Sequence, residues 1–234
     1  MKKGLRSQIA ARYADGDGVK QSRDLNTVFQ AMEDATADYT AGIFFAALYE
    51  AHRFGPKRAA LVNEKLGDIG SREDSQGKEN ETRDFTEYWR HVLKQENVDT
   101  RKVQYIANVI MKLTTLGTKN RNIQRNIQEF ADRVVIACLF ILWRDFRFKE
   151  KRLLPVQNKM YDLAWLIDKK QMMVFEPMKF SAEKAGITFT TLKMCEEEHG
   201  EIFIGTKRQI KDWYKKHPEE AAEWRRLYER KENV

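Results

Sequence analysis

The sequence is poor in the residues that interrupt regular structure or cross-link it. Its 234 residues include only four prolines, twelve glycines and two cysteines, whereas lysine, arginine, glutamate, alanine and leucine are abundant. This balance favours helix over strand, because the abundant residues are good helix formers and the scarce ones are not. Cys138 and Cys195 lie far apart in apolar or helical segments, so we expect neither a disulfide framework nor a zinc site. A reducing cytoplasm is the predicted location, that of the host if a phage encodes the chain.

Long apolar runs are also missing. The longest, Val134 to Trp143, has ten residues and is closed by Arg133 and Arg144, whereas a bilayer needs about 20. The first eighteen residues are basic but lack the apolar segment of a signal peptide. We therefore expect neither a membrane protein nor an exported one.

Compact catalytic motifs are absent as well. The sequence has no glycine-rich dinucleotide loop, Walker loop, H-E-x-x-H zinc motif or G-x-S-x-G nucleophile motif. The histidines His52, His91, His199 and His217 lie in separate segments. The acidic residues beside His199 are ordinary for a solvated turn. We expect no enzyme activity, no cofactor and no metal site.

Positive charge exceeds negative charge over the whole chain. Lysine and arginine number 42 and aspartate and glutamate 35, which gives a net charge of +7 and a pI of about 9.3. That balance suits an anionic partner such as nucleic acid. Hydrophobic residues make up 42% and charged residues 33%, a composition typical of a folded globular chain.

The chain contains an internal repeat. Residues 37–69 align without a gap on residues 131–163, and ten of these 33 positions are identical, whereas about two identities are expected by chance. Asn26/Asn120 and Gln30/Gln124 extend the match, so the copies cover 26–69 and 120–163. The identical pairs are Ala37/Ala131, Asp38/Asp132, Leu48/Leu142, Arg53/Arg147, Phe54/Phe148, Lys57/Lys151, Arg58/Arg152, Val62/Val156, Lys65/Lys159 and Asp68/Asp162.

Hydrophobic periodicity predicts that each copy is a long helix followed by a short one. Gly55 is expected to end the first long helix in a left-handed conformation, and Pro56 to begin the next helix. Pro155 predicts a later start or a kink in the second short helix. Polar residues 70–83 are expected to form a solvated loop, and residues 1–23 a polar arm. The expected helices are 24–53, 56–69, 84–96, 100–116, 120–147 and 156–168.

Both copies carry paired basic residues at the junction between the two helices. Cations in a first helical turn oppose the helix dipole, and a bound anion would relieve that conflict. Contact with phosphates or an acidic surface is one interpretation; solvation, or pairing with carboxylates such as Asp68 and Asp162, is the other. Phe54 and Phe148 are expected to close the hairpins rather than stack on bases. The basic residues are Arg53, Lys57, Arg58, Arg147, Lys151 and Arg152.

The C-terminal part has the spacing of a helix-turn-helix. A small residue at Ala182 lets two helices approach, and Gly186 suits a left-handed turn. Apolar residues at 187, 192 and 195 then hold the second helix on the first. The stretch AEKAGITFTTLKM resembles bacterial and phage helix-turn-helix regulators, and the following GEIFIGTKRQIKDW is similar to the hairpin wing and closing helix of excisionase-like or MerR-like winged domains.

This resemblance implies DNA contacts at two places. The start of the second helix would face the major groove and the wing would lie against phosphate. Two departures from the pattern are Ser181, where a larger aliphatic is usual, and the acidic run Glu196 to Glu198, which suits a segment used for protein contact instead. The implied recognition-helix residues are Thr188, Phe189, Thr190, Thr191 and Lys193, and the wing residues are Lys207 and Arg208.

The repeat motif LYEAHRFGPKRAALVNEKL also resembles a stretch of small uncharacterised phage and prophage proteins of Gram-positive bacteria. Phe54, Gly55, Lys57 and Arg58 keep that pattern, and Tyr49 and Arg53 depart from it. The resemblance implies a mobile-element origin and no particular activity.

Together these patterns predict an all-α protein. A bundle of two related hairpins over 24–168 is followed by a small helix-turn-helix-like domain, with or without a wing, over 176–234. The first functional hypothesis is a DNA-binding regulatory or accessory protein of a phage or mobile element, acting on double-stranded DNA. The second is a non-enzymatic interaction protein that inhibits or scaffolds a host protein, as phage counter-defence factors do. Either a pseudo-symmetric monomer or a homodimer fits the repeat.

Overall fold

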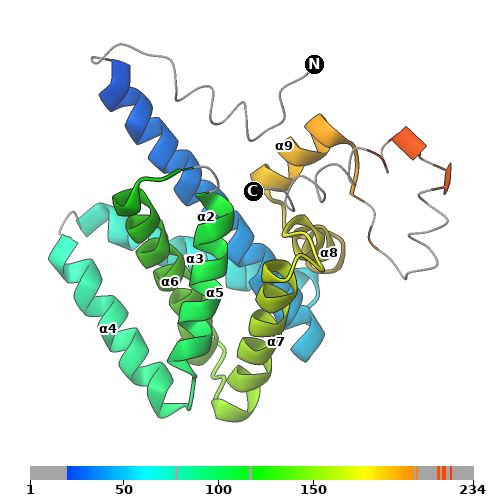
Figure 1. Ribbon diagram of the computed structural model, residues 1–234. Helices are drawn as coiled ribbons and strands as arrows, with labels where there is room; N and C mark the ends of the chain where they lie inside the picture. The colour runs from blue at the N-terminus through cyan, green and yellow to red at the C-terminus, as the bar shows by residue number, and fades with distance from the viewer. Residues whose placement is uncertain are drawn as a thin grey trace.

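The chain folds into a bundle of helices. The computed structural model describes residues 20–76, 79–115, 118–202, 204, 215–216, 218–219 and 222. These residues contain no β-strand, so the all-α prediction is confirmed for them. Figure 1 labels the helices: α2 (Lys20–His52), α3 (Pro56–Gln76), α4 (Glu79–Gln95), α5 (Thr100–Thr114), α6 (Arg121–Arg144), α7 (Glu150–Asp168), α8 (Phe175–Ala185) and α9 (Thr190–His199).

Helix α6 lies at the centre of the bundle, as its apolar sequence predicts. Its buried residues run without a break from Val135 to Leu142, because neighbouring helices cover it on all sides: α2, α3, α4, α5 and α7 all pack against it. Helix α2 has a matching buried stretch from Ile43 to Leu48. The two long helices of the repeat therefore form the core of the bundle.

The junction between the long and the short helix falls at equivalent positions in the two copies. Pro56 begins α3 as predicted, and Glu150, 94 residues later, begins α7. The left-handed residue of each junction is arginine: φ is 54° at Arg53 and 53° at Arg147. The prediction that Gly55 takes this conformation is wrong, because the chain has already reversed two residues earlier.

Two further expectations are corrected by the helix boundaries. Residues 70–76 extend α3 and residues 79–83 open α4, where a loop was expected; their Glu, Lys, Arg and Gln residues are helix formers even without an apolar face. Helix α7 does not start late, because it begins at Glu150 and contains Pro155. Pro155 lies on the exposed side of the second turn of α7. It is tolerated there, although it has no N–H to donate to the backbone hydrogen bonds of the helix.

The remaining helices cover opposite sides of the bundle. Figure 1 shows α4 at one edge and α8 with α9 at the other. Helices α4 and α5 pack on α6, whereas α8 and α9 pack on α2. Asp38 and Asp132, identical positions of the repeat, each hold one of these outer elements: Thr191 donates to Asp38, and Arg90 donates to Asp132.

Helix α8 lies directly on α2. The hydroxyl of Ser181 donates to the carbonyl oxygen of Gly42 at 3.0 Å, and a Cβ at Gly42 would lie only 3.2 Å from the Cα of Met178. The predicted domain boundary near residue 176 is not accompanied by a break in the core, since buried residues of α8 and α9 belong to the same apolar cluster as those of α2 and α6.

Among the described residues, no helix has the length and apolarity needed to cross a membrane.

Candidate nucleic-acid interface

The two basic turns, defined as residues 53–58 and 147–152, lie side by side. The rings of Phe54 and Phe148 meet edge to face with centroids 5.9 Å apart, and both side chains are buried, at 3% and 1% exposure. His52 packs on Phe148 at 5.0 Å, and its repeat equivalent, Phe146, packs on Phe54 at 6.0 Å. These reciprocal contacts are those that an approximate twofold axis between the two rings produces. Both phenylalanines therefore close the hairpins, as predicted.

A hydrogen bond ties the end of one hairpin to the other. Nε2 of His52 donates to the carbonyl oxygen of Arg152 at 2.7 Å, which assigns the ring proton to Nε2 because a carbonyl can only accept. His52 was not predicted as a site residue, and its sequence context gives no signal for this role.

Arginines of the turns also make cation–π contacts with aromatic residues four positions earlier in the chain. The guanidinium of Arg58 lies 5.4 Å from the centroid of Phe54, and that of Arg152 lies 3.7 Å from the centroid of Phe148. The guanidinium of Arg53 lies 5.4 Å from the ring of Tyr49. An arginine that contacts an aromatic ring can still donate its N–H groups to solvent or to an anion.

The six predicted basic residues of the turns are all exposed. Within the part of the chain that the structure describes, none of them forms an ion pair. One of the carboxylates that the sequence suggested as a partner is engaged elsewhere, since Asp68 pairs with Lys65 at 3.0 Å. The fold thus collects two sets of cations, 94 residues apart in the chain, at one end of the bundle.

The first backbone position of α3 and that of α7 meet their hydrogen-bonding needs in different ways. A carboxylate oxygen of Glu96 accepts from the backbone N–H of Glu150 at 3.0 Å, and the other accepts from Lys149 at 2.9 Å and from Trp143 Nε1 at 3.1 Å. The equivalent position in α3 is Pro56, which has no N–H to satisfy. The sequence gives no signal for Glu96, because it reaches α7 only through the packing of α4 and α5.

Helices α8 and α9 meet at a left-handed glycine, as the sequence predicts. Gly186 ends α8 in the left-handed region, with φ of 68°. Ile187, Leu192 and Cys195 are buried and hold α9 in place. Burial raises the pKa of the Cys195 thiol to about 12, with Glu198 and Glu196 adding to the rise, so this cysteine remains an uncharged packing residue.

The residues predicted to read DNA divide into two groups. Phe189 is 5% exposed and belongs to the core. Thr191 faces α2, where its backbone N–H donates to Asp38 at 2.9 Å and its hydroxyl donates to the same carboxylate. Thr188, Thr190 and Lys193 are exposed. The predicted wing residues Lys207 and Arg208 lie outside the described residues.

The acidic run at the end of α9 is partly neutralised within the chain. Lys179 donates to Glu196 and to Glu201, each at 2.8 Å. Glu197 and Glu198 are exposed, and Lys193 lies 3.9 Å from Glu197 on the same helix. No metal-binding group of three or more histidine, cysteine, aspartate or glutamate side chains occurs within the described part of the chain.

A contact joins the α8–α9 turn to the first basic turn. A Cβ at Gly186 would lie 3.3 Å from the Cβ of Pro56, so the α8–α9 turn rests on the start of α3. Two segments that the sequence suggested separately for phosphate contact and base contact are therefore neighbours.

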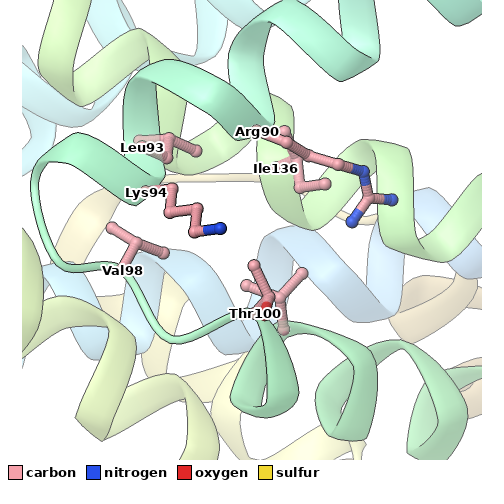
Figure 2. A pocket seen from close by; sticks show the side chains of 7 residues that line it. Arg90, Leu93, Lys94, Val98, Thr100 and Ile136 are labelled. Carbon is pink, nitrogen blue, oxygen red and sulfur yellow. The ribbon is translucent and has the colours of Figure 1, made fainter.

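A small hollow lies between α4, α5 and α6. Figure 2 shows its labelled side chains converging from these helices and from the α4–α5 loop. Aliphatic side chains provide most of the lining, and Arg90 at its rim is bonded to Asp132. This lining suits packing better than recognition of a polar ligand. The residues are Arg90, Leu93, Lys94, Val98, Thr100, Val103 and Ile136.

The chain was compared with protein-family models, curated proteins and solved structures, and none of them matches it.

Proposed function

We propose that the chain binds double-stranded DNA in the cytoplasm, as a regulatory or accessory protein of a phage or mobile element. The observation that supports this most is the gathering of Arg53, Lys57 and Arg58 with Arg147, Lys151 and Arg152 around one pair of rings. Exposed cations without carboxylate partners are suited to phosphate, because arginine offers several donors and lysine a mobile point charge.

In this proposal only a few exposed side chains of the α8–α9 segment contact the bases. Thr188, Thr190 and Lys193 remain exposed near the start of α9, whereas Phe189 and Thr191 serve the fold. Phosphate contacts position a protein on the duplex and base contacts give sequence preference. We therefore expect affinity to come mainly from the basic turns, with modest discrimination between sequences.

The experiment is a titration of a labelled, mixed-sequence duplex with the full chain at 50 and 200 mM salt, followed by fluorescence anisotropy. If the six turn cations contact phosphate, affinity falls by roughly 10³-fold between these salt concentrations. Absence of binding at 50 mM salt, despite the net charge of +7, would contradict the proposal. The mass of the protein in solution, measured alongside, distinguishes a monomer from a homodimer.

A second candidate function is binding to a host protein. Phe85 and Tyr88 lie one turn apart on α4 and are 49% and 54% exposed; exposed aromatic residues in proximity favour protein contact. A pulldown from host lysate treated with nuclease tests this candidate. Recovery of one protein in stoichiometric amount, lost on Phe85→Ser but kept on Leu61→Ser, supports it; recovery of none counts against it.

A further inference from the structure

The two basic turns differ in the acidic residues that surround them. Residues 53–58 carry three cations and no carboxylate, whereas the matching residues 147–152 carry four cations and one carboxylate, Glu150. The repeat thus keeps the same Arg-Phe and Lys-Arg pairs in both copies, and each turn has a net charge of +3 from its own residues (3 − 0 and 4 − 1). The difference between the turns therefore depends on the carboxylates that other elements bring to them.

A second carboxylate, Glu96, reaches the second turn from the α4–α5 loop and lowers the net charge there from +3 to +2. Glu96 accepts from Lys149 at 2.9 Å and from the backbone N–H of Glu150 at 3.0 Å, and Lys149 also lies 5.1 Å from the ring of Trp143. The N-terminus of α7 and its nearest lysine are therefore already occupied by a carboxylate of the chain itself. The first turn has no such group at its equivalent residue, Pro56.

Beside the first turn, by contrast, lie exposed polar side chains of the α8–α9 segment. The α8–α9 turn rests on Pro56 through Gly186, and on either side of Gly186 the side chains of Lys184 and Thr188 are exposed. Lys184 lies in the last turn of α8. No equivalent basic extension follows from the α4–α5 loop, which brings Glu96 to the second turn instead.

We propose that the DNA-binding surface is one-sided. It consists of Arg53, Lys57, Arg58, Lys184 and Thr188, here called the first-turn surface; its four cations contact the phosphates of a duplex, and Thr188 lies beside them at the bases. The second turn, held by Glu96, serves mainly to brace the bundle through Phe148. This inference rests on the proposed DNA binding, and it goes further by assigning unequal roles to two halves with the same motif.

The repeat supplies matched variants for the test. Lys57→Gln with Arg58→Gln removes two charges from the first turn, and Lys151→Gln with Arg152→Gln removes the same two from the second. Both pairs are exposed, and both arginines contact a phenylalanine ring, at 5.4 Å for Arg58 and 3.7 Å for Arg152. Thermal unfolding of each double variant verifies that the fold is retained.

The expected result is a difference between the two double variants. In the anisotropy titration at 150 mM salt, the first-turn variant loses roughly 10-fold or more in affinity, and the slope of log affinity against log salt becomes shallower by about two. The second-turn variant changes by less than about threefold. Equal losses, or a larger loss for the second turn, overturn the one-sided surface while leaving DNA binding intact. No binding by the unmodified chain overturns the proposed function and this inference with it.

A second comparison tests whether the α8–α9 turn shares the surface. Thr188→Glu places a negative charge beside the first turn, and Asn122→Glu places one at the far end of α6, where the side chain is also exposed. We expect Thr188→Glu to weaken binding by roughly threefold or more and Asn122→Glu to leave it nearly unchanged. Equal effects of the two variants would exclude Thr188 from the surface.

Discussion

Phe54 and Phe148 occupy the same position in the two copies of the repeat, and their rings touch edge to face at 5.9 Å. Each ring also carries an arginine of its own turn, Arg58 or Arg152. This aromatic contact between the two hairpins thus lies where their two sets of cations come together.

The first prediction concerns this pair. Phe54→Leu and Phe148→Leu are each expected to lower the free energy of unfolding by about 1–2 kcal/mol, because each leaves a buried ring site partly filled. The double variant should depart from additivity by about 0.5–1.5 kcal/mol, the usual contribution of an aromatic contact. Urea unfolding of the four proteins measures this coupling. Phe148→Leu combined with Ile127→Val, at the other end of α6, should be additive.

The second prediction concerns the contact between α2 and α8. Gly42→Ala places a Cβ against Met178 and is expected to destabilise the fold by about 1–3 kcal/mol, as overpacking does. Gly67→Ala in α3 is the matched control, since nothing lies within 4 Å of its added Cβ, and it should stabilise the fold by about 0.5–1 kcal/mol. Thermal unfolding compares the two. A neutral Gly42→Ala would mean that α8 does not lie tightly on α2.

The third prediction concerns the start of α9. Asp38 accepts two hydrogen bonds from Thr191 and so caps α9 from another helix. Asp38→Ala is expected to cost about 0.5–2 kcal/mol, with the loss concentrated in α9. Amide hydrogen exchange should show faster exchange there than in α4, which depends on Asp132 instead. Uniformly faster exchange throughout the bundle would contradict a local role.

The fourth prediction concerns pH. Hydrogen bonding from Lys149, together with the N–H of Glu150 and Trp143, lowers the pKa of Glu96 below its ordinary value of 4.5, although burial acts in the opposite direction. A carboxyl group whose pKa is lowered on folding stabilises the folded state above its unfolded pKa, and this contribution is lost as pH falls through the folded pKa.

Glu96→Gln should therefore lower the free energy of unfolding at pH 7 by about 1.5–3 kcal/mol, and the difference from the unmodified chain should shrink as pH falls below 4.5. Denaturant unfolding at pH 7, 5 and 3 measures it. Glu64→Gln, at an exposed carboxylate 3.8 Å from Lys65, should have little effect at any of these pH values. A difference that persists unchanged at pH 3 would show that charge on Glu96 is not the cause.

The sequence predicts the elements well where one physical signal dominates. The apolar periodicity of α2 and α6, the start of α3 at Pro56 and the left-handed Gly186 all follow from local preferences. Local rules fail at Gly55, because the reversal falls on Arg53, and a propensity for glycine cannot fix the position of a turn to one residue. They also fail for residues 70–76, where helix propensity without an apolar face was insufficient to predict a helix.

The candidate site could be predicted only in part, because the sequence identifies its residues but not the contacts that bring them together. The repeat identified the six basic residues, but their proximity depends on Phe54 meeting Phe148, which no local pattern specifies. Glu96 and His52 act through contacts made across 54 and 100 residues of chain. Likewise, the packing of Phe189 and Thr191 against the body arises from α2, so a motif read in isolation assigned them to the exposed face.

The way α2 is covered has a consequence for the order in which the chain folds. Its apolar stretch from Ile43 to Leu48 is packed by α6, α7 and α8, and the bond from Ser181 to Gly42 spans 139 residues. During synthesis α2 therefore leaves the ribosome long before the segments that bury it. Contacts of such long range close slowly, and an apolar helix without its cover is prone to aggregate. Fragments that end before α8 should need a chaperone, and the bundle can complete its core only after translation has passed residue 202.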